Sequence, residues 1–221
     1  MERDLAVLAV LGLPVRDRSP HLPWSEAERV RTEALLPARF VQLHPFSRWS
    51  YKDLAPAILL PVLQRLAREG IPVVLTGADD PAERARAADI LREMGAGITN
   101  LAGRLSLSEL AHVSSRSALY MGSDTAAMHI AAAVGTPVVA WFGPSLTASW
   151  GPWDGTAGDS PYQNRGGIQR MGRHVVLQAA EPCVPCNRRG CEDSGRSRCL
   201  EVLSSAVILR EAARVLGQPL D

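Results

Sequence analysis

The sequence has 221 residues, of which 46% are hydrophobic and 21% charged, and its formal net charge is +1. This length suffices for one large globular domain, or for one domain and a fragment of another. The nearly balanced charge gives no reason to expect nucleic acid or an anionic membrane as a partner. No apolar run approaches the roughly 20 residues that cross a bilayer, and we do not expect the apolar run near the N-terminus to act as a secretory signal. We therefore expect a cytoplasmic chain whose four cysteines are reduced.

The N-terminal part, residues 1–36, contains two helical patterns, around residues 5–11 and 25–36, that are joined by a proline-rich stretch. These patterns offer too little apolar surface for a domain of their own.

Residues 40–141 alternate between short apolar runs and longer stretches with helical spacing. Strands are expected at 40–43, 72–75, 98–101, 118–121 and 137–141, and helices at 53–69, 81–94, 106–115 and 125–134. Strands separated by helices of this length predict right-handed crossovers and a parallel sheet covered on both faces. Ser106 with Glu109 three residues later predicts a capping box. The expected fold class is α/β, a doubly wound, Rossmann-like parallel sheet.

The remaining third of the chain is harder to interpret. Residues 143–173 are rich in glycine and show no clear periodicity, which favours a long functional or disordered loop. A cysteine-bearing segment, residues 183–199, follows, and residues 204–216 have the pattern of a closing helix.

Ligands of doubly wound sheets bind beyond the carboxyl ends of the strands, where helix N-termini favour phosphate. The loop after the first strand, residues 44–52, contains Ser47 and Lys52, the only lysine among 24 basic residues. An ammonium differs from a guanidinium in size, hydration and reach. The loop is therefore a candidate phosphate cradle, or else a solvated loop in which Ser50 caps a helix.

Two further loops lie at expected strand ends. In residues 122–129, Asp124 or Ser123 can cap the following helix, and His129 lies on the same helical face as Thr125. His129 is thus a candidate site residue or an ordinary core histidine. The acids of residues 76–84 can accept hydrogen bonds from sugar hydroxyls, or can simply favour a helix N-terminus. The sequence has no Walker A, dinucleotide-binding or G-x-S-x-G motif.

Taken together, these motifs resemble glycosyltransferase family 9. The resemblance rests on the loop from His44 to Lys52, on Thr76-Gly77-Ala78 with Glu83, on Gly122-x-Asp124-Thr125 with His129, and on residues 135–144. The stretch from Pro182 to Leu200 is similar to the heptosyltransferase III branch.

The resemblance implies the donor-binding half of a GT-B enzyme that transfers L-glycero-D-manno-heptose from ADP-heptose to the inner core of lipopolysaccharide. The transfer would invert the anomeric centre without a metal ion or cofactor. Lys52, Asp124 and His129 are the implied catalytic residues. The implied substrate-binding residues are Ser47, Lys52, Glu83, Leu105, Asp124, Thr125, Ala126 and His129. Two departures are Ala126, where much of the family has glycine, and Asp53-Leu54, which replaces a tryptophan-containing continuation.

The resemblance also implies a domain organisation. Residues 1–36 would be the remnant of an N-terminal acceptor domain and its connector, 37–203 the donor domain, and 204–221 the closing helix. The expected partners are ADP-heptose, the lipopolysaccharide inner core, the missing acceptor domain and, peripherally, the inner membrane. The alternatives are a non-catalytic nucleotide- or glycan-binding module, or an enzyme that uses another sugar nucleotide, such as a UDP-sugar.

The four cysteines need separate consideration. Cys183, Cys186, Cys191 and Cys199 could supply four thiolates to a tetrahedral zinc ion. Alternatively they are reduced and partly buried, or form disulfides after purification. The arginines of the same segment, Arg188, Arg189, Arg196 and Arg198, could meet phosphates of a core oligosaccharide or remain solvated.

Overall fold

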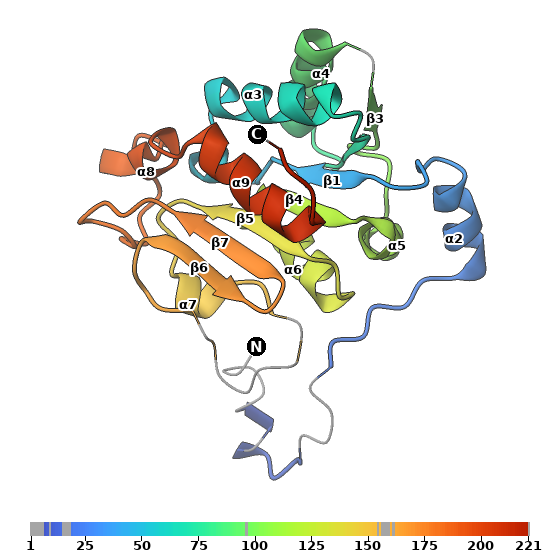
Figure 1. Cartoon of the computed structure of the whole chain (residues 1–221). Coiled ribbons are helices and arrows are strands. Elements are labelled where there is room, and N and C mark those ends of the chain that lie inside the picture. Colours follow the sequence, from blue (N-terminus) through green and yellow to red (C-terminus); the bar gives the residue numbers. More distant parts are fainter. Residues whose placement is uncertain are drawn as a thin grey trace.

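The computed structural model describes residues 7–8, 10–14, 19–95, 97–153, 155, 160 and 162–220. These residues form a seven-stranded sheet with helices on both faces (Figure 1). The strands are β1 (Val41–His44), β2 (Val73–Leu75), β3 (Ile98–Asn100), β4 (Leu119–Ser123), β5 (Val138–Phe142), β6 (Gly167–Met171) and β7 (His174–Gln178). The α-helices are α2 (Glu26–Glu33), α3 (Pro56–Arg68), α4 (Pro81–Met94), α5 (Leu107–Arg116), α6 (Ala126–Ala133), α7 (Thr147–Trp150), α8 (Arg198–Glu201) and α9 (Ser205–Leu216).

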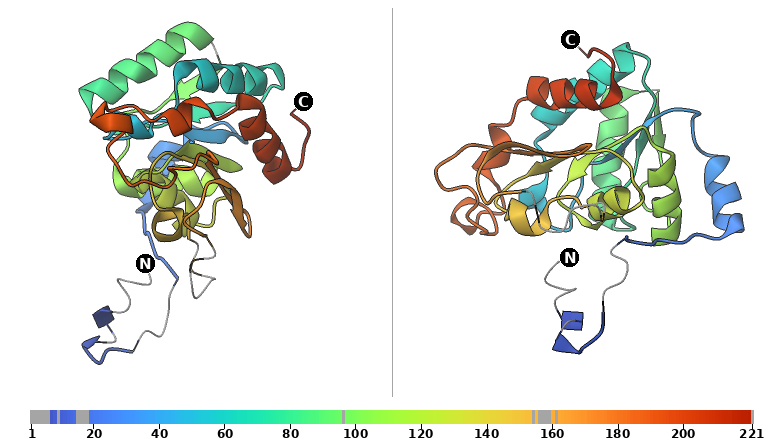
Figure 2. Two further views of the ribbon diagram at one scale, coloured as in Figure 1. Left: turned by 90° about the vertical axis from the view of Figure 1, so that its left-hand side faces the viewer. Right: turned by 60° about the horizontal axis from the view of Figure 1, so that its bottom comes forward.

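The strand order is β3-β2-β1-β4-β5-β7-β6, and every neighbouring pair is parallel except β6 with β7. This confirms the predicted doubly wound α/β fold, with the five expected strands shifted by one or two residues. The helices lie in two layers, with α3, α4 and α9 over one face of the sheet and α5 and α6 over the other (Figures 1 and 2).

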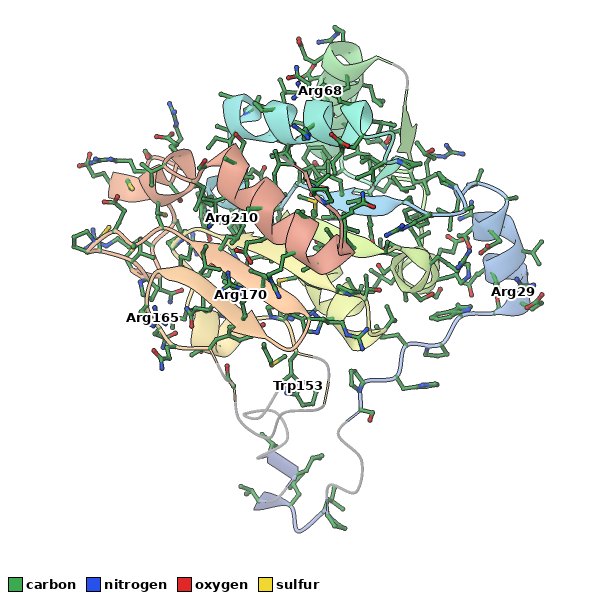
Figure 3. The ribbon with its side chains drawn as sticks, viewed as in Figure 1. Arg29, Arg68, Trp153, Arg165, Arg170 and Arg210 are labelled. Carbon is green, nitrogen blue, oxygen red and sulfur yellow. The ribbon has the colours of Figure 1, made fainter. Side chains whose placement is uncertain are left out.

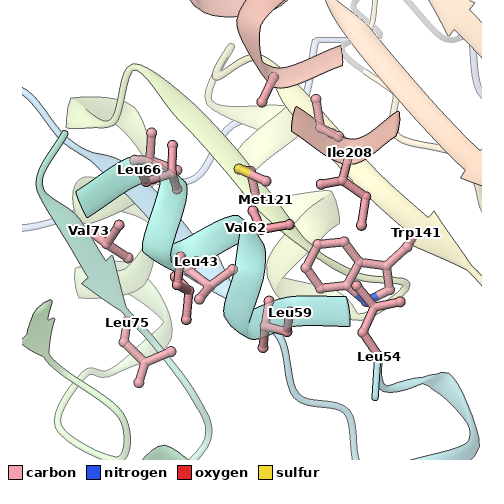
Figure 4. Packing of buried hydrophobic residues seen from close by; sticks show 14 of the residues in the cluster. Leu43, Leu54, Leu59, Val62, Leu66, Val73, Leu75, Met121, Trp141 and Ile208 are labelled. Atoms are coloured by element: carbon pink, nitrogen blue, oxygen red, sulfur yellow. The ribbon is translucent and has the colours of Figure 1, made fainter. Parts of the chain in front are cut away.

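Successive residues of the central strands face opposite layers, as a strand requires. On β4, Leu119 and Met121 belong to the core beneath α3 and α9, whereas Tyr120 belongs to the core on the α6 side. On β5, Trp141 packs into the first of these cores, and Phe142 packs into the second. Both faces are apolar because helices cover both, which explains the continuous hydrophobic runs of the parallel strands. Figure 4 shows the first core, in which α3 lies across the strands.

The hairpin of β6 and β7 is the main difference from the sequence prediction. The expected structureless loop 143–173 is wrong for residues 147–150, which form α7, and for residues 167–171, which form β6 and pair antiparallel with β7. β7 itself extends the sheet by pairing in parallel with β5. The sheet is therefore mixed at this edge. Residues 154, 156–159 and 161 of the predicted loop lie outside the described residues.

The described part of residues 1–36 includes α2, which packs against α5. Arg31 forms an ion pair with Glu109, and Thr32 Oγ1 lies 2.6 Å from His112 Nδ1. Of the predicted helix 5–11, residues 7, 8 and 10 are helical, and residues 5, 6 and 9 lie outside the described residues.

The predicted closing helix is present as α9, which packs on α3 and contributes Ile208 to the core. Its buried Glu211 binds Arg170 of β6 at 2.7 Å. Figure 3 labels Arg170 together with Arg210, which belongs to α9. None of the helices described is both long and apolar enough to cross a membrane.

Candidate functional site

The site lies where the carboxyl ends of β1 and β4 meet. His44 is paired with Gly122 in register, so the loops that follow these two strands leave the sheet side by side. A Cβ atom on Gly122 would lie 2.5 Å from both the His44 carbonyl oxygen and the Tyr120 hydroxyl. Glycine is therefore required at this position for packing, and the two loops approach more closely than any side chain would permit.

A buried hydrogen-bond chain fixes the two loops to each other. The Ser123 hydroxyl donates to the Pro45 carbonyl at 2.8 Å, and the Trp141 indole N–H donates to the Ser123 oxygen at 2.9 Å. Ser123 and Trp141 are both fully buried. Because these groups are satisfied within the core, the chain joins the ends of β1, β4 and β5 into one rigid base.

Lys52 and Asp124 form the centre of the site. Lys52 closes a short 3-10 helix, Ser50–Lys52, and its Nζ lies 2.6 Å from Asp124 Oδ2. The Asp124 side chain is 4% exposed and that of Lys52 is 20% exposed. The ammonium group of the single lysine therefore lies at the carboxyl ends of the central strands and remains partly exposed to solvent.

The sequence-based capping assignment at α6 is wrong. Thr125 is the N-cap residue, and its side chain makes no capping hydrogen bond. Asp124 binds Lys52 instead, and Ser123 belongs to the buried chain described above. Neither side chain caps the helix, because Asp124 forms an ion pair and Ser123 forms a hydrogen bond in the core.

α6 therefore begins without a side-chain cap, directly after the pair of residues Asp124 and Thr125, of which Asp124 binds Lys52. Ala126 is exposed and is the first residue of the helix. Of the first-turn N–H groups of α6, that of Met128 donates to the Thr125 carbonyl at 3.1 Å. The N–H groups that begin a helix carry the positive end of its dipole. The Thr125 and Tyr120 hydroxyls are both buried and lie close to each other. Burial raises the pKa of Tyr120, and the nearby Thr125 hydroxyl opposes this rise.

His129 lies one turn further along α6. Its ring is half-buried and is 6.4 Å from the ring of Trp150 in α7. Burial lowers the pKa of His129, Asp124 opposes this shift, and Lys52 adds to it. His129 is therefore within electrostatic range of the Lys52–Asp124 pair and is neutral near pH 7.

Ser47 and Glu83 are buried rather than open to solvent. The Ser47 oxygen accepts a hydrogen bond from the Trp49 N–H at 3.1 Å, which leaves its hydroxyl proton free to donate. Glu83 accepts a hydrogen bond from the Ala78 N–H at 2.7 Å and so shapes the loop after β2. In the described structure Glu83 makes no direct contact with Lys52 or Asp124. Leu105 is half-buried and packs against two apolar clusters on the α5 side of the sheet.

Asp53 is a residue that the sequence did not identify as part of the site. It follows Lys52 directly and forms an ion pair with Arg86 of α4. Burial raises the pKa of Asp53 to about 7, Arg86 opposes the rise, and Glu83 adds to it. Asp53 and Arg86 line a pocket of about 720 Å³ whose floor includes Phe46, Leu59 and Ile90. The one feature of the sequence that could have identified Asp53 is its position directly after Lys52.

The four cysteines are all free and line a second pocket, of about 520 Å³. Burial raises the pKa of Cys199 to about 11, and the other three thiols add to the rise. Among the described residues, no group of three or more histidine, cysteine, aspartate or glutamate side chains is arranged to hold a metal ion. The zinc hypothesis thus stays a prediction. Of the nearby arginines, Arg196 forms an ion pair with Glu201.

Comparison with known proteins gives a consistent picture. The family model for glycosyltransferase family 9 (heptosyltransferase) matches residues 1–168. Lipopolysaccharide heptosyltransferase 3 of Escherichia coli is 31% identical over 159 residues, which are 69% of this chain and 47% of that protein. The chain thus spans about half the length of the curated relatives it matches.

Two solved structures share the fold. A family 9 glycosyltransferase from Veillonella parvula has a TM-score of 0.73 at 21% identity, over 96% of this chain and 58% of that one. The E. coli ADP-heptose lipopolysaccharide heptosyltransferase II has a TM-score of 0.64 at 22% identity, over 88% of this chain and 52% of that one. With the family match over more than half of its length, the chain belongs to glycosyltransferase family 9.

Proposed function

We propose that this chain binds ADP-heptose and provides the donor half of an enzyme that transfers heptose to the inner core of lipopolysaccharide. The observation that carries the proposal is the Lys52–Asp124 pair at the open N-terminus of α6. A partly exposed ammonium next to the N-terminus of a helix that has no side-chain cap is suited to a diphosphate. The E. coli heptosyltransferases of similar sequence and fold support heptose as the sugar and ADP as the nucleotide.

In the proposed reaction, an acceptor hydroxyl attacks the anomeric carbon as the bond to the ADP diphosphate breaks, which inverts that carbon. The leaving diphosphate gains negative charge, and the Lys52 ammonium together with the first turn of α6 stabilises it. These groups provide the stabilisation without a metal ion. Asp124 holds Lys52 in place, and Thr125 and Ala126 line the helix start.

Under this proposal the remaining residues orient the substrate. The Ser47 hydroxyl donates to the diphosphate, Glu83 shapes the donor side of the cleft through the Ala78 N–H, and Leu105 flanks the adenine. His129, neutral near pH 7 because burial lowers its pKa, accepts a hydrogen bond from the sugar. We assign the acceptor-binding and base-providing half to a separate domain, because the chain covers 47% of the E. coli relative. Residues 1–36 are the proposed remnant of that domain and its connector, residues 37–203 the donor domain and residues 204–221 the closing helix.

Calorimetric titration of the chain with ADP-heptose, ADP and UDP-glucose tests this proposal. We expect both adenine nucleotides to bind more tightly than UDP-glucose. Replacing Lys52 with alanine should weaken ADP binding by at least tenfold, since a charge-assisted phosphate contact is lost. Equal affinity for UDP-glucose, or unchanged ADP binding in Lys52→Ala, would contradict the donor assignment.

A further inference from the structure

The loop between β1 and α3 displays an exposed aromatic side chain beside the proposed donor site. Trp49 directly precedes the 3-10 helix that ends at Lys52, and 43% of its surface is exposed. The Tyr51 ring stacks on it, with the ring centroids 6.2 Å apart and the planes at 26°. A tryptophan exposed to this degree is not needed for the core, and it offers rigid apolar surface to a ligand.

Two guanidinium groups from different parts of the chain lie against the same ring. The Arg48 guanidinium is 5.5 Å from the ring centroid, and that of Arg189, in the cysteine-bearing segment, is 5.6 Å from it. Both arginines are exposed. Neither forms an ion pair with a carboxylate among the described residues, in contrast to Arg196 of the same segment, which binds Glu201. Their N–H donors are therefore free to bind an anion.

Hydrogen bonds hold the cysteine-bearing segment on this loop. The Ser197 hydroxyl donates to the Tyr51 carbonyl at 2.7 Å, and the Ser50 hydroxyl donates to the Gly195 carbonyl at 3.5 Å. The loop itself is shaped by the Trp49 N–H, which donates to Ser47. The two arginines and the tryptophan are thus brought together by the folded structure, which reduces the entropy lost when a ligand binds.

The chemistry of this surface fits a sugar that carries an anionic group. The tryptophan ring can pack against the C–H groups of a saccharide, and guanidinium groups bind phosphate through paired hydrogen bonds. The balanced charge of the whole chain argues against a general affinity for polyanions. We propose that Arg48, Trp49 and Arg189 form a subsite for a phosphorylated saccharide next to Lys52. The inference rests on the proposed function and assigns this chain a direct contact with the acceptor.

Nuclear magnetic resonance titration of the chain, monitored at its tryptophan indole N–H signals, tests the inference. The probes are mannose 6-phosphate, mannose and inorganic phosphate, each added separately. We expect mannose 6-phosphate to shift the Trp49 signal and to bind at least threefold more tightly than mannose or phosphate, because only it engages both the ring and the arginines. In Trp49→Ala and Arg189→Gln, monitored through backbone amide signals, its affinity should fall by at least threefold.

The matched control is Arg68→Gln, which removes an exposed arginine at the end of α3 (Figure 3). It should leave the mannose 6-phosphate affinity within twofold of the original. Affinity unchanged in both subsite variants, or phosphate bound as tightly as mannose 6-phosphate, would overturn the inference. Tighter binding of oligothymidylate would assign the surface to nucleic acid and would also overturn it.

ADP affinity, measured on the same samples, separates this inference from the proposed function. We expect ADP to bind the Trp49 and Arg189 variants as it binds the original chain, because neither residue contacts the nucleotide in our proposal. Absence of ADP binding in the original chain would refute the donor assignment, whereas the mannose 6-phosphate titration alone decides the subsite.

Discussion

The coupling energy of the Lys52–Asp124 ion pair can be predicted and then measured in a double-mutant cycle. Lys52→Met removes the charge and keeps most of the aliphatic stem, and Asp124→Asn removes the carboxylate charge and keeps its shape. Exposed ion pairs couple by about 0.2–1 kcal/mol, whereas breaking a buried pair costs about 3–5 kcal/mol. Asp124 is buried and Lys52 is 20% exposed, so the pair lies between these limits. We expect a coupling energy of about 1–3 kcal/mol.

The two single variants should differ. Lys52→Met leaves a buried carboxylate without its cation, whereas Asp124→Asn leaves an ammonium that can turn to solvent. We therefore expect Lys52→Met to be the more destabilising. Urea unfolding of the four proteins, followed by circular dichroism, gives the free energies of unfolding. A coupling energy below about 0.3 kcal/mol would refute the reasoning, because independent sites are additive to within that amount.

Three further predictions concern stability. Gly122→Ala should lower the free energy of unfolding by about 1–3 kcal/mol, because the alanine Cβ would lie 2.5 Å from the His44 carbonyl oxygen and the Tyr120 hydroxyl. Urea unfolding measures this loss, and an unchanged midpoint would contradict the prediction. Folding raises the pKa of Asp53 to about 7, so the folded state binds a proton that the unfolded state has lost, and the free energy of unfolding falls as pH rises from about 4 to 7. Asp53→Asn should reduce this pH dependence of stability. An unaltered slope would exclude Asp53 as the cause of the pH dependence. Ser106→Ala removes the cap of α5 and should cost about 1 kcal/mol by thermal unfolding, whereas no loss would mean that the capping box does not contribute.

Much of the fold follows from local sequence features. The five parallel strands and their helices were predictable because buried strands and amphipathic helices have distinct periodicities. The capping box at Ser106 and Glu109 is present as predicted, because it depends only on residues three positions apart. The hairpin of β6 and β7 was missed, since β6 is an edge strand whose burial does not alternate cleanly along its length.

The candidate site was predictable only in part. The motif residues Lys52 and Asp124, which are 72 positions apart, do meet at one sheet edge, as parallel topology requires. What the sequence could not give is the choice between partners. Asp124 can cap a helix or bind a cation. It binds the cation because the tertiary fold places Lys52 within reach of its carboxylate. The perturbed pKa of Asp53 likewise depends on burial and on Arg86, which belongs to a different helix.

The most direct test of the account is a crystal structure of the chain with ADP. We predict that the diphosphate lies within hydrogen-bond distance of Lys52 Nζ and of the first N–H groups of α6, with Asp124 still in contact with the lysine. A diphosphate bound elsewhere, for example in the pocket lined by Asp53 and Arg86, with the Lys52–Asp124 region empty, would contradict the central claim.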